Sequence, residues 1–285
     1  MDKLINLIKK RPIISSFIIA VCANQYTELP LRSFLSSFMT YQAALMLSIF
    51  ILQMSCFGLL LYLSHRLDCA HSFNLRLSQP IKSLWLIIPF FIFIIANIID
   101  CMKPEHITDN PPIFILYSFA FLSTGFFEEI LFRGILFNLI NDKFGSTNKG
   151  FFFSVFASSI FFGSAHIVNF FNGTMPLINF INQCIYASII GVLFTALYLR
   201  CNTLLIPIII HGLIDITGCT EFLAITSEQL FTSSRVQSVI DYKTIIATLI
   251  LFLPFLLWSL FLLRKVKPEK NSSLKLSIQK LWHNN

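Results

Sequence analysis

The stretch IFILYSFAFLSTGFFEEILFRGILFNLI, residues 113–140, is an apolar run that contains three charged residues, Glu128, Glu129 and Arg133. A helix that crosses a bilayer needs about 20 apolar residues, so this run can span a membrane but is too long for one straight span. Each charge at the centre of a bilayer costs about 2.5–3.5 kcal/mol on insertion scales. The three charges therefore require a structural or a chemical reason.

The composition of the whole chain also indicates a membrane protein. Of the 285 residues, 55% are hydrophobic and only 12% are charged, and the mean hydropathy is +0.74. Soluble domains carry about 25% charged residues, so this composition excludes an ordinary soluble protein. We predict an all-α fold, a polytopic membrane helix bundle. The seven cysteines are scattered singly without the spacing of metal ligands, which favours buried, small hydrophobic side chains.

Eight apolar runs predict about eight transmembrane helices in a single transmembrane domain, residues 1–285. The runs lie at about 12–22, 39–63, 82–100, 112–140, 150–168, 177–199, 203–220 and 244–263. Lysine and arginine residues concentrate before the first run, in alternate loops and in a basic tail, residues 264–285. The positive-inside rule then places both termini in the cytoplasm. The alternative interpretation of the first run is a cleaved signal peptide, which would leave an odd number of spans.

The charges in the opening stretch have a defined geometry on a helix. Glu129 and Arg133 are four residues apart with the acid first, which predicts an ion pair within the helix. Glu128 points about 100° away and has no partner in its own helix. A lone carboxyl group in an apolar site is a candidate general base. The alternative is that all three charges only lock neighbouring helices together.

Two further polar clusters lie in later apolar runs. FFGSAH, residues 161–166, ends in His166 and contains small residues that let another backbone approach. HGLID places His211 and Asp215 four residues apart, and an aspartate that accepts from one ring nitrogen fixes the tautomer of a histidine. Both clusters also have a structural interpretation, as a satisfied core histidine and as a buried pair. Three clusters in neighbouring spans converge more easily on one site than on three.

The three motifs resemble, in order and spacing, those of the CAAX prenyl endopeptidase and bacteriocin-processing family, also called CPBP or Abi. EEILFR fits the family motif EExxxR, FFGSAH contains FxxxH, and HGLID fits HxxxN or HxxxD. The resemblance covers about residues 112–220, which we expect to be the catalytic core. It implies a glutamate-type intramembrane endopeptidase. The catalytic residues that it implies are Glu128, Glu129, Arg133, His166, His211 and Asp215.

The resemblance also implies a role for each residue. Glu128 and His166 would activate the attacking water, and the predicted ion pair would support the site. His211 and the residue at position 215 would stabilise the oxyanion. The best-studied members have asparagine where this chain has Asp215, and an ionised aspartate cannot donate to an oxyanion. Asp215 must therefore either be protonated or act through His211 by orienting it as the donor, and we expect the second.

Three alternatives remain at this point. Glu128, His166 and His211 would also make a zinc site with water in the fourth position, although we expect no cofactor. Buried acids and histidines also mark proton-coupled transporters, although no matching half-repeats are present in the sequence. The third alternative is a non-catalytic membrane protein that binds, or gives immunity to, a bacteriocin-like peptide.

The expected partners follow from the same reasoning. They are the lipid bilayer and a membrane-associated or prenylated peptide or protein substrate. Nucleic acid is not expected, because the net charge of +7 comes from residues that flank apolar runs and not from basic–aromatic segments. The expected location is a bacterial inner (plasma) membrane, as a multi-pass protein.

Overall fold

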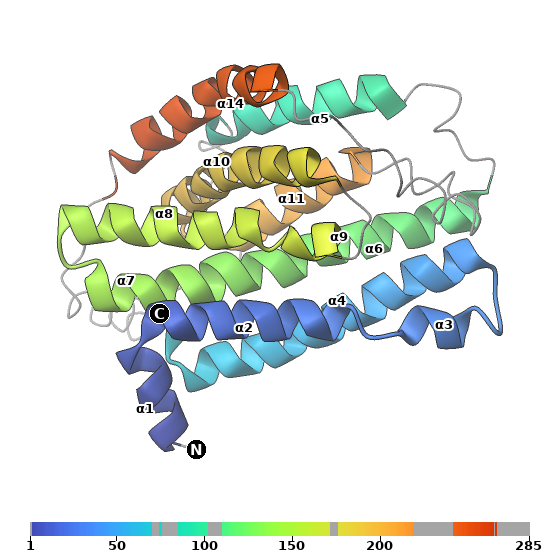
Figure 1. The fold of residues 1–285 in the computed structure, drawn as a ribbon, viewed down its shortest axis with the longest axis horizontal. Coiled ribbons are helices and arrows are strands. Elements are labelled where there is room, and N and C mark those ends of the chain that lie inside the picture. Colours follow the sequence, from blue (N-terminus) through green and yellow to red (C-terminus); the bar gives the residue numbers. More distant parts are fainter. Residues whose placement is uncertain are drawn as a thin grey trace, which may run out of the picture.

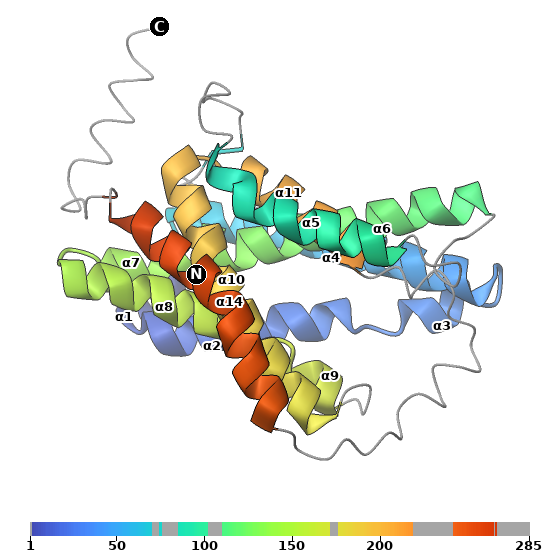
Figure 2. The same cartoon turned by 90° about the horizontal axis from the view of Figure 1, so that it is seen from above.

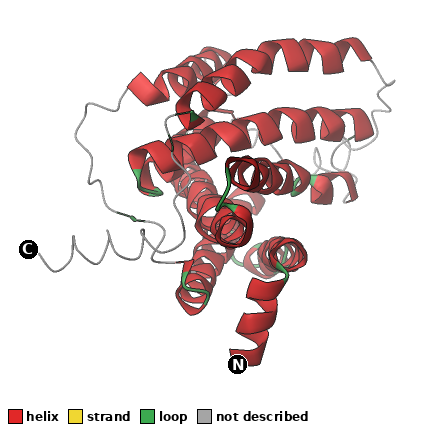
Figure 3. Cartoon of the chain, turned by 90° about the vertical axis from the view of Figure 1, so that its left-hand side faces the viewer, coloured by secondary structure: helices red, strands yellow, loops and turns green. Residues whose placement is uncertain are grey.

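The computed structural model describes residues 2–69, 74–75, 85–101, 110–171, 176–218, 242–264 and 266. Within these ranges the regular secondary structure is entirely helical, which confirms the predicted all-α class (Figure 3). Most of the predicted basic tail lies outside the described residues.

Each of the eight apolar runs coincides with a helix, apart from small differences at the ends. These helices are α2 (Pro12–Thr27), α4 (Tyr41–Arg66), α5 (Ile88–Cys101), α6 (Pro111–Glu129) with its continuation η4 (Ile130–Phe137) and α7 (Asn138–Phe144), α8 (Asn148–Ser164), α10 (Leu177–Cys201), α11 (Leu205–Gly218) and α14 (Tyr242–Leu263). Three shorter helices accompany them, namely α1 (Asp2–Lys10), α3 (Leu31–Leu35) and α9 (Ile167–Phe171).

Four helices in the described part of the chain are long and apolar enough to cross a membrane. They are Tyr41–Arg66, Pro111–Phe144, Leu177–Cys201 and Lys243–Leu263. Two shorter apolar helices, Trp85–Ile99 and Leu205–Gly218, accompany them. The chain is thus an integral membrane protein by its helices, whereas the number of eight spans and the cytoplasmic termini stay predictions.

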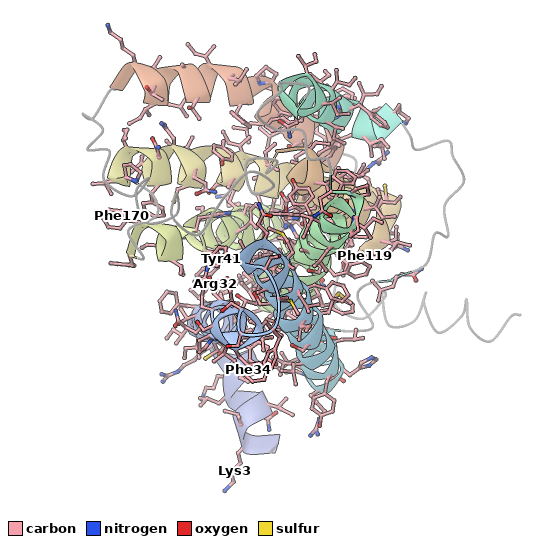
Figure 4. The ribbon with its side chains drawn as sticks, turned by 90° about the vertical axis from the view of Figure 1, so that its right-hand side faces the viewer. Lys3, Arg32, Phe34, Tyr41, Phe119 and Phe170 are labelled. Atoms are coloured by element: carbon pink, nitrogen blue, oxygen red, sulfur yellow. The ribbon has the colours of Figure 1, made fainter. Side chains whose placement is uncertain are left out.

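The helices pack so that α6 and α10 occupy the inside of the bundle. α6 lies between α4 and α11, and α10 lies between α8 and α14, which crosses it obliquely (Figures 1 and 2). The outward side chains are apolar, as on α6, where Phe119 points away from the bundle (Figure 4). An apolar outer surface over apolar helices is what a bilayer requires.

Local signals set the ends of the helices that carry the site. The side chain of Asn110 accepts a hydrogen bond from a backbone N–H in the first turn of α6, at 3.3 Å. Thr147 does the same for α8 at 3.1 Å. Both are residue types that favour the N-cap position. At the other end of α10, Asn202 adopts the left-handed conformation with φ of 52°, which asparagine tolerates better than most residues.

The long helix 111–144 contains a π-helical segment, η4, that the sequence did not predict. A π-helix shifts the hydrogen-bond ladder by one residue, and such segments occur frequently at functional sites. Asn138 donates from Nδ2 to the carbonyl oxygens of Arg133 and Gly134, at 2.9 and 3.0 Å. The same amide lies 3.3 Å from the hydroxyl of Tyr198 on α10. Asn138 therefore stabilises the segment that carries Arg133.

Candidate functional site

Two glycines bring the backbones of α6 and α11 close together. A Cβ atom at Gly125 would collide with the carbonyl oxygen of Ile208 on α11. A Cβ atom at Gly212 would lie 2.7 Å from Cδ1 and 3.0 Å from Cα of Leu122 on α6. Small residues allow such close approach of helices in a membrane. This crossing brings the acids at the end of α6 to the histidine of α11.

A buried acid, Glu129, lies at the centre of the site. Its Oε1 atom accepts from Nη1 of Arg133 at 2.7 Å and contacts Nδ1 of His211 at 2.8 Å. The side chains of Glu129 and Arg133 are 0% and 1% exposed, so their charges neutralise each other inside the protein. The ion pair predicted from the spacing is confirmed. Arg133 also donates from Nη2 to the carbonyl oxygen of Gly191 on α10, at 3.2 Å.

The bond to Glu129 fixes the orientation of the His211 ring. An ionised carboxylate only accepts hydrogen bonds, so Nδ1 of His211 is the donor in this contact. The ring also stacks on Phe194, with centroids 5.0 Å apart and an interplanar angle of 22°. Its other nitrogen, Nε2, is therefore held towards the remaining acids of the site.

Nε2 of His211 lies between two carboxyl groups. It is 3.6 Å from Oε2 of Glu128 and 3.6 Å from Oδ2 of Asp215. The side chains of Glu128 and Asp215 are 18% and 21% exposed, whereas that of His211 is buried. These two carboxyl groups therefore lie on the accessible side of the site. The short bond that orients His211 comes from Glu129, whereas the sequence had suggested Asp215 for this role. A separation of 3.6 Å is too long for a direct hydrogen bond.

His166 lies in a different position from the one the sequence predicted. α8 ends at Ser164, so His166 occupies the turn between α8 and α9 and not the interior of a spanning helix. The apolar run continues past it, but the helix is interrupted there. His166 shares the ring of Phe162 with His211, with centroid distances of 6.0 and 5.7 Å. Its buried Nδ1 atom makes no hydrogen bond to any described residue.

The structure thus gathers five of the six predicted residues around His211 and places His166 against the ring of Phe162, which His211 also contacts. Residues 110–217, which hold all three motifs, match the family model described as Rce1-like, type II CAAX prenyl endopeptidase Rce1-like. The match covers less than half of the chain, which is similar to that family over these residues, called the Rce1-like segment below. The match confirms the resemblance drawn from the motifs. Neither the comparison with curated proteins nor the comparison with solved structures found a match.

Aromatic rings of the Rce1-like segment surround the arginine of the site. The guanidinium carbon of Arg133 lies 4.5 Å from the ring centroid of Phe162 and 5.2 Å from that of Phe194. A cation over an aromatic face is stabilised by the charge distribution of the ring, more strongly when water is excluded. Phe162 therefore serves both the arginine and the two histidines, which gives the first position of the FxxxH motif a physical role.

Two side chains hold the peptide groups on either side of Asp215. The hydroxyl of Tyr117 on α6 donates to the carbonyl oxygen of Ile216 at 2.7 Å. The amide of Asn97 on α5 donates to the carbonyl oxygen of Ile214 at 3.3 Å. Neither residue belongs to a motif, and α5 lies outside the Rce1-like segment, so the sequence analysis missed both. They fix the last turn of α11 and with it the position of the Asp215 carboxyl group.

The sequence left a zinc site as an alternative to a site without a cofactor. Within the described ranges, no three His, Cys, Asp or Glu side chains are placed to hold a metal ion. The proposed set was Glu128, His166 and His211, of which the two histidines contact the same ring of Phe162. Zinc ligands lie about 2.0–2.2 Å from the metal, which requires all three to converge on one point. We therefore derive no chemical step through a metal.

Proposed function

We propose that this chain is an intramembrane endopeptidase that hydrolyses a peptide bond with a water activated by Glu128. The Rce1-like segment supports a CAAX-type intramembrane protease. The observation that carries the mechanism is the position of Nε2 of His211, 3.6 Å from the Glu128 carboxylate, with the opposite side of the ring held by Glu129. A partly exposed acid beside a fixed imidazole is suited to moving a proton at a substrate.

The reaction follows from these positions. Glu128 takes a proton from water, and the hydroxide adds to the carbonyl carbon of the scissile peptide bond. The negative charge that forms on the carbonyl oxygen accepts a hydrogen bond from Nε2–H of His211, protonated on both nitrogens. The carboxylic acid of Glu128 then returns its proton to the leaving nitrogen as the C–N bond breaks, and a carboxylic acid and an amine result. In this scheme His166 positions the water.

The proposed substrate is a membrane-associated peptide, with prenylated CAAX ends as the first class to test. In such ends the cysteine carries an isoprenoid chain that brings the peptide to the bilayer. The test uses the full chain in liposomes with a fluorogenic peptide, farnesylated or not, that ends in a CAAX sequence. We expect the farnesylated peptide to be cleaved faster. Failure to cleave either peptide, or any peptide in an extract of bacterial membranes, would contradict the proposed activity.

Neither non-catalytic alternative is favoured. The family match points to a protease and not to a transporter or a peptide-sequestering protein. The same liposomes distinguish these functions, because a proton-coupled transporter would acidify the vesicle interior without cleaving the peptide. An immunity protein would bind its peptide without releasing fragments.

Metal removal provides a prediction about the type of protease. We expect the cleavage rate to stay within about twofold in a strong zinc chelator, because the candidate ligands do not converge. Cleavage is measured before and after dialysis against the chelator, with the zinc content of the protein determined in parallel. Loss of activity that added zinc restores would show that the enzyme is a metallopeptidase.

A second prediction concerns the hydrogen bond from Tyr117 to α11. Tyr117→Phe removes the bond to the carbonyl oxygen of Ile216 while keeping the ring. One hydrogen bond contributes about 0.5–1.5 kcal/mol, so we expect kcat to fall roughly 2- to 10-fold as Asp215 shifts, with KM unchanged. The matched control is Tyr26→Phe, which removes a bond of 3.0 Å to Ser55 between α2 and α4.

The two tyrosine variants separate positioning from stability. Both are expected to lower the unfolding temperature by similar amounts, since each loses one bond between helices. Only Tyr117→Phe is expected to lower kcat. Equal kcat values in the two variants would mean that the hydrogen bond from Tyr117 to α11 has no role in the reaction.

A further inference from the structure

The N-terminal helix α1 has two distinct faces. Its sequence is DKLINLIKK, and each residue turns the helix by about 100°. Leu4, Ile5, Leu7 and Ile8 therefore fall within an arc of about 160°, with polar and basic residues opposite. This pattern describes an amphipathic helix, whereas the spanning helices of this chain are apolar all round.

Only half of the apolar face of α1 is covered by the bundle. Ile5 and Ile8 pack against the main hydrophobic core. Leu4 and Leu7 are 59% and 52% exposed. Lys9 anchors the helix through an ion pair of 2.7 Å with Asp68 at the end of α4. The remaining apolar edge has no partner among the described residues.

The direction of α1 places this edge at the end of the bundle. The chain bends at Arg11, where φ is −125° and ψ is 62°, before Pro12 begins α2. α1 then runs across the direction of α2 and its neighbours (Figures 1 and 3). α4, which packs beside α2, is long and apolar enough to cross a membrane. When α4 crosses the bilayer, a helix that runs across its direction at one end lies along the membrane surface.

The charges next to the exposed leucines identify the surface they meet. Lys3 points away from the bundle at the tip of α1 (Figure 4). Lys10 and Arg11 are exposed at the other end of the helix. Amphipathic helices with apolar and basic residues bind the boundary between headgroups and acyl chains. Lysine and arginine residues near a membrane of anionic lipids strengthen that attraction.

We propose that α1 is an interfacial helix that binds anionic phospholipid. Leu4 and Leu7 enter the acyl boundary, and Lys3, Lys10 and Arg11 contact the phosphate headgroups. The Lys9–Asp68 pair couples this lipid-bound helix to the end of α4. The inference does not depend on the proposed peptidase activity.

The test measures hydrogen exchange of residues 2–10 in the full chain, held in nanodiscs of phosphatidylcholine alone or with 30% phosphatidylglycerol. We expect exchange to be about tenfold slower in the anionic nanodiscs. Lys3→Gln/Lys10→Gln/Arg11→Gln should remove the difference between the two compositions. Leu4→Ser/Leu7→Ser should exchange rapidly in both. Unchanged exchange of α6 shows that each variant is folded.

The control variant Lys143→Gln/Lys149→Gln removes two exposed positive charges elsewhere and should exchange like the unmodified chain. Equal exchange of residues 2–10 in both lipid compositions would overturn the proposal, as would a lipid effect that persists in the triple variant. Protection that appears only when a nanodisc holds two copies would assign the exposed leucines to self-association instead.

Discussion

Glu128→Gln is expected to lower the rate of peptide cleavage at least a hundredfold while the protein stays folded. The amide keeps the shape of the side chain but cannot take a proton from water. General acid–base catalysis contributes about 10²–10⁴ to enzymatic rates, and here the same group accepts the proton and returns it. The measurement is the initial rate of cleavage of the fluorogenic peptide in liposomes. The variant should still bind the peptide, since the loss is in the chemical step.

A matched control distinguishes catalysis from a general effect of losing a carboxylate. Glu28 follows α2 and is exposed, so Glu28→Gln removes one acid far along the chain from the motifs. We expect this variant to cleave at the normal rate. If Glu128→Gln also cleaved at the normal rate, Glu128 would not be the base, and the network around His211 would have a structural role only.

The helices of this chain were predictable because hydropathy is a local property. Each apolar run of the sequence coincides with a helix over most of its length, and the fixed geometry of a helix turn predicted the pair of Glu129 and Arg133. The break after Ser164 was not predicted, because the apolar pattern continues through it while the backbone forms a turn at His166. Hydropathy shows that a segment is apolar, but it does not show where the backbone hydrogen bonds of a helix end.

The sequence alone did not predict which side chains contact one another between helices. The bond between His211 and Glu129 joins residues that are 82 positions apart, and it depends on which helices are neighbours. The sequence held one signal for the contact between α6 and α11. Gly125 lies just before the EExxxR motif and Gly212 lies inside the HxxxD motif, and both allow a close helix crossing. Asn97 gave no such signal, since one polar residue in an apolar helix does not identify its partner.

The pair of Glu129 and Arg133 yields the largest expected effect on stability. Arg133→Met leaves Glu129 fully buried, with His211 as its remaining partner. Breaking a buried ion pair by removing one partner costs about 3–5 kcal/mol, because the other charge is left uncompensated. The loss of guanidinium contacts with Phe162 and Phe194 adds to this cost. The measurement is the unfolding free energy of the purified protein in detergent.

The control for this prediction is an arginine with a similar contact outside the site. The guanidinium carbon of Arg32 lies 5.3 Å from the ring centroid of Tyr41, and the arginine is only partly buried. Arg32→Met should therefore cost less than about 1 kcal/mol. A similarly small loss for Arg133→Met would contradict the interpretation of Glu129 as an ionised, buried partner.

The double variant Glu129→Gln/Arg133→Met tests the electrostatic origin of the effect. Replacing the acid with an amide removes the uncompensated charge. The unfolding free energy of the double variant should therefore exceed that of Arg133→Met alone by about 1–3 kcal/mol. Cleavage should not recover with stability, because glutamine no longer holds Nδ1 of His211 as an ionised acceptor does. If stability and activity returned together, the pair would support the fold alone, and the orientation of His211 would come from the stacked ring of Phe194.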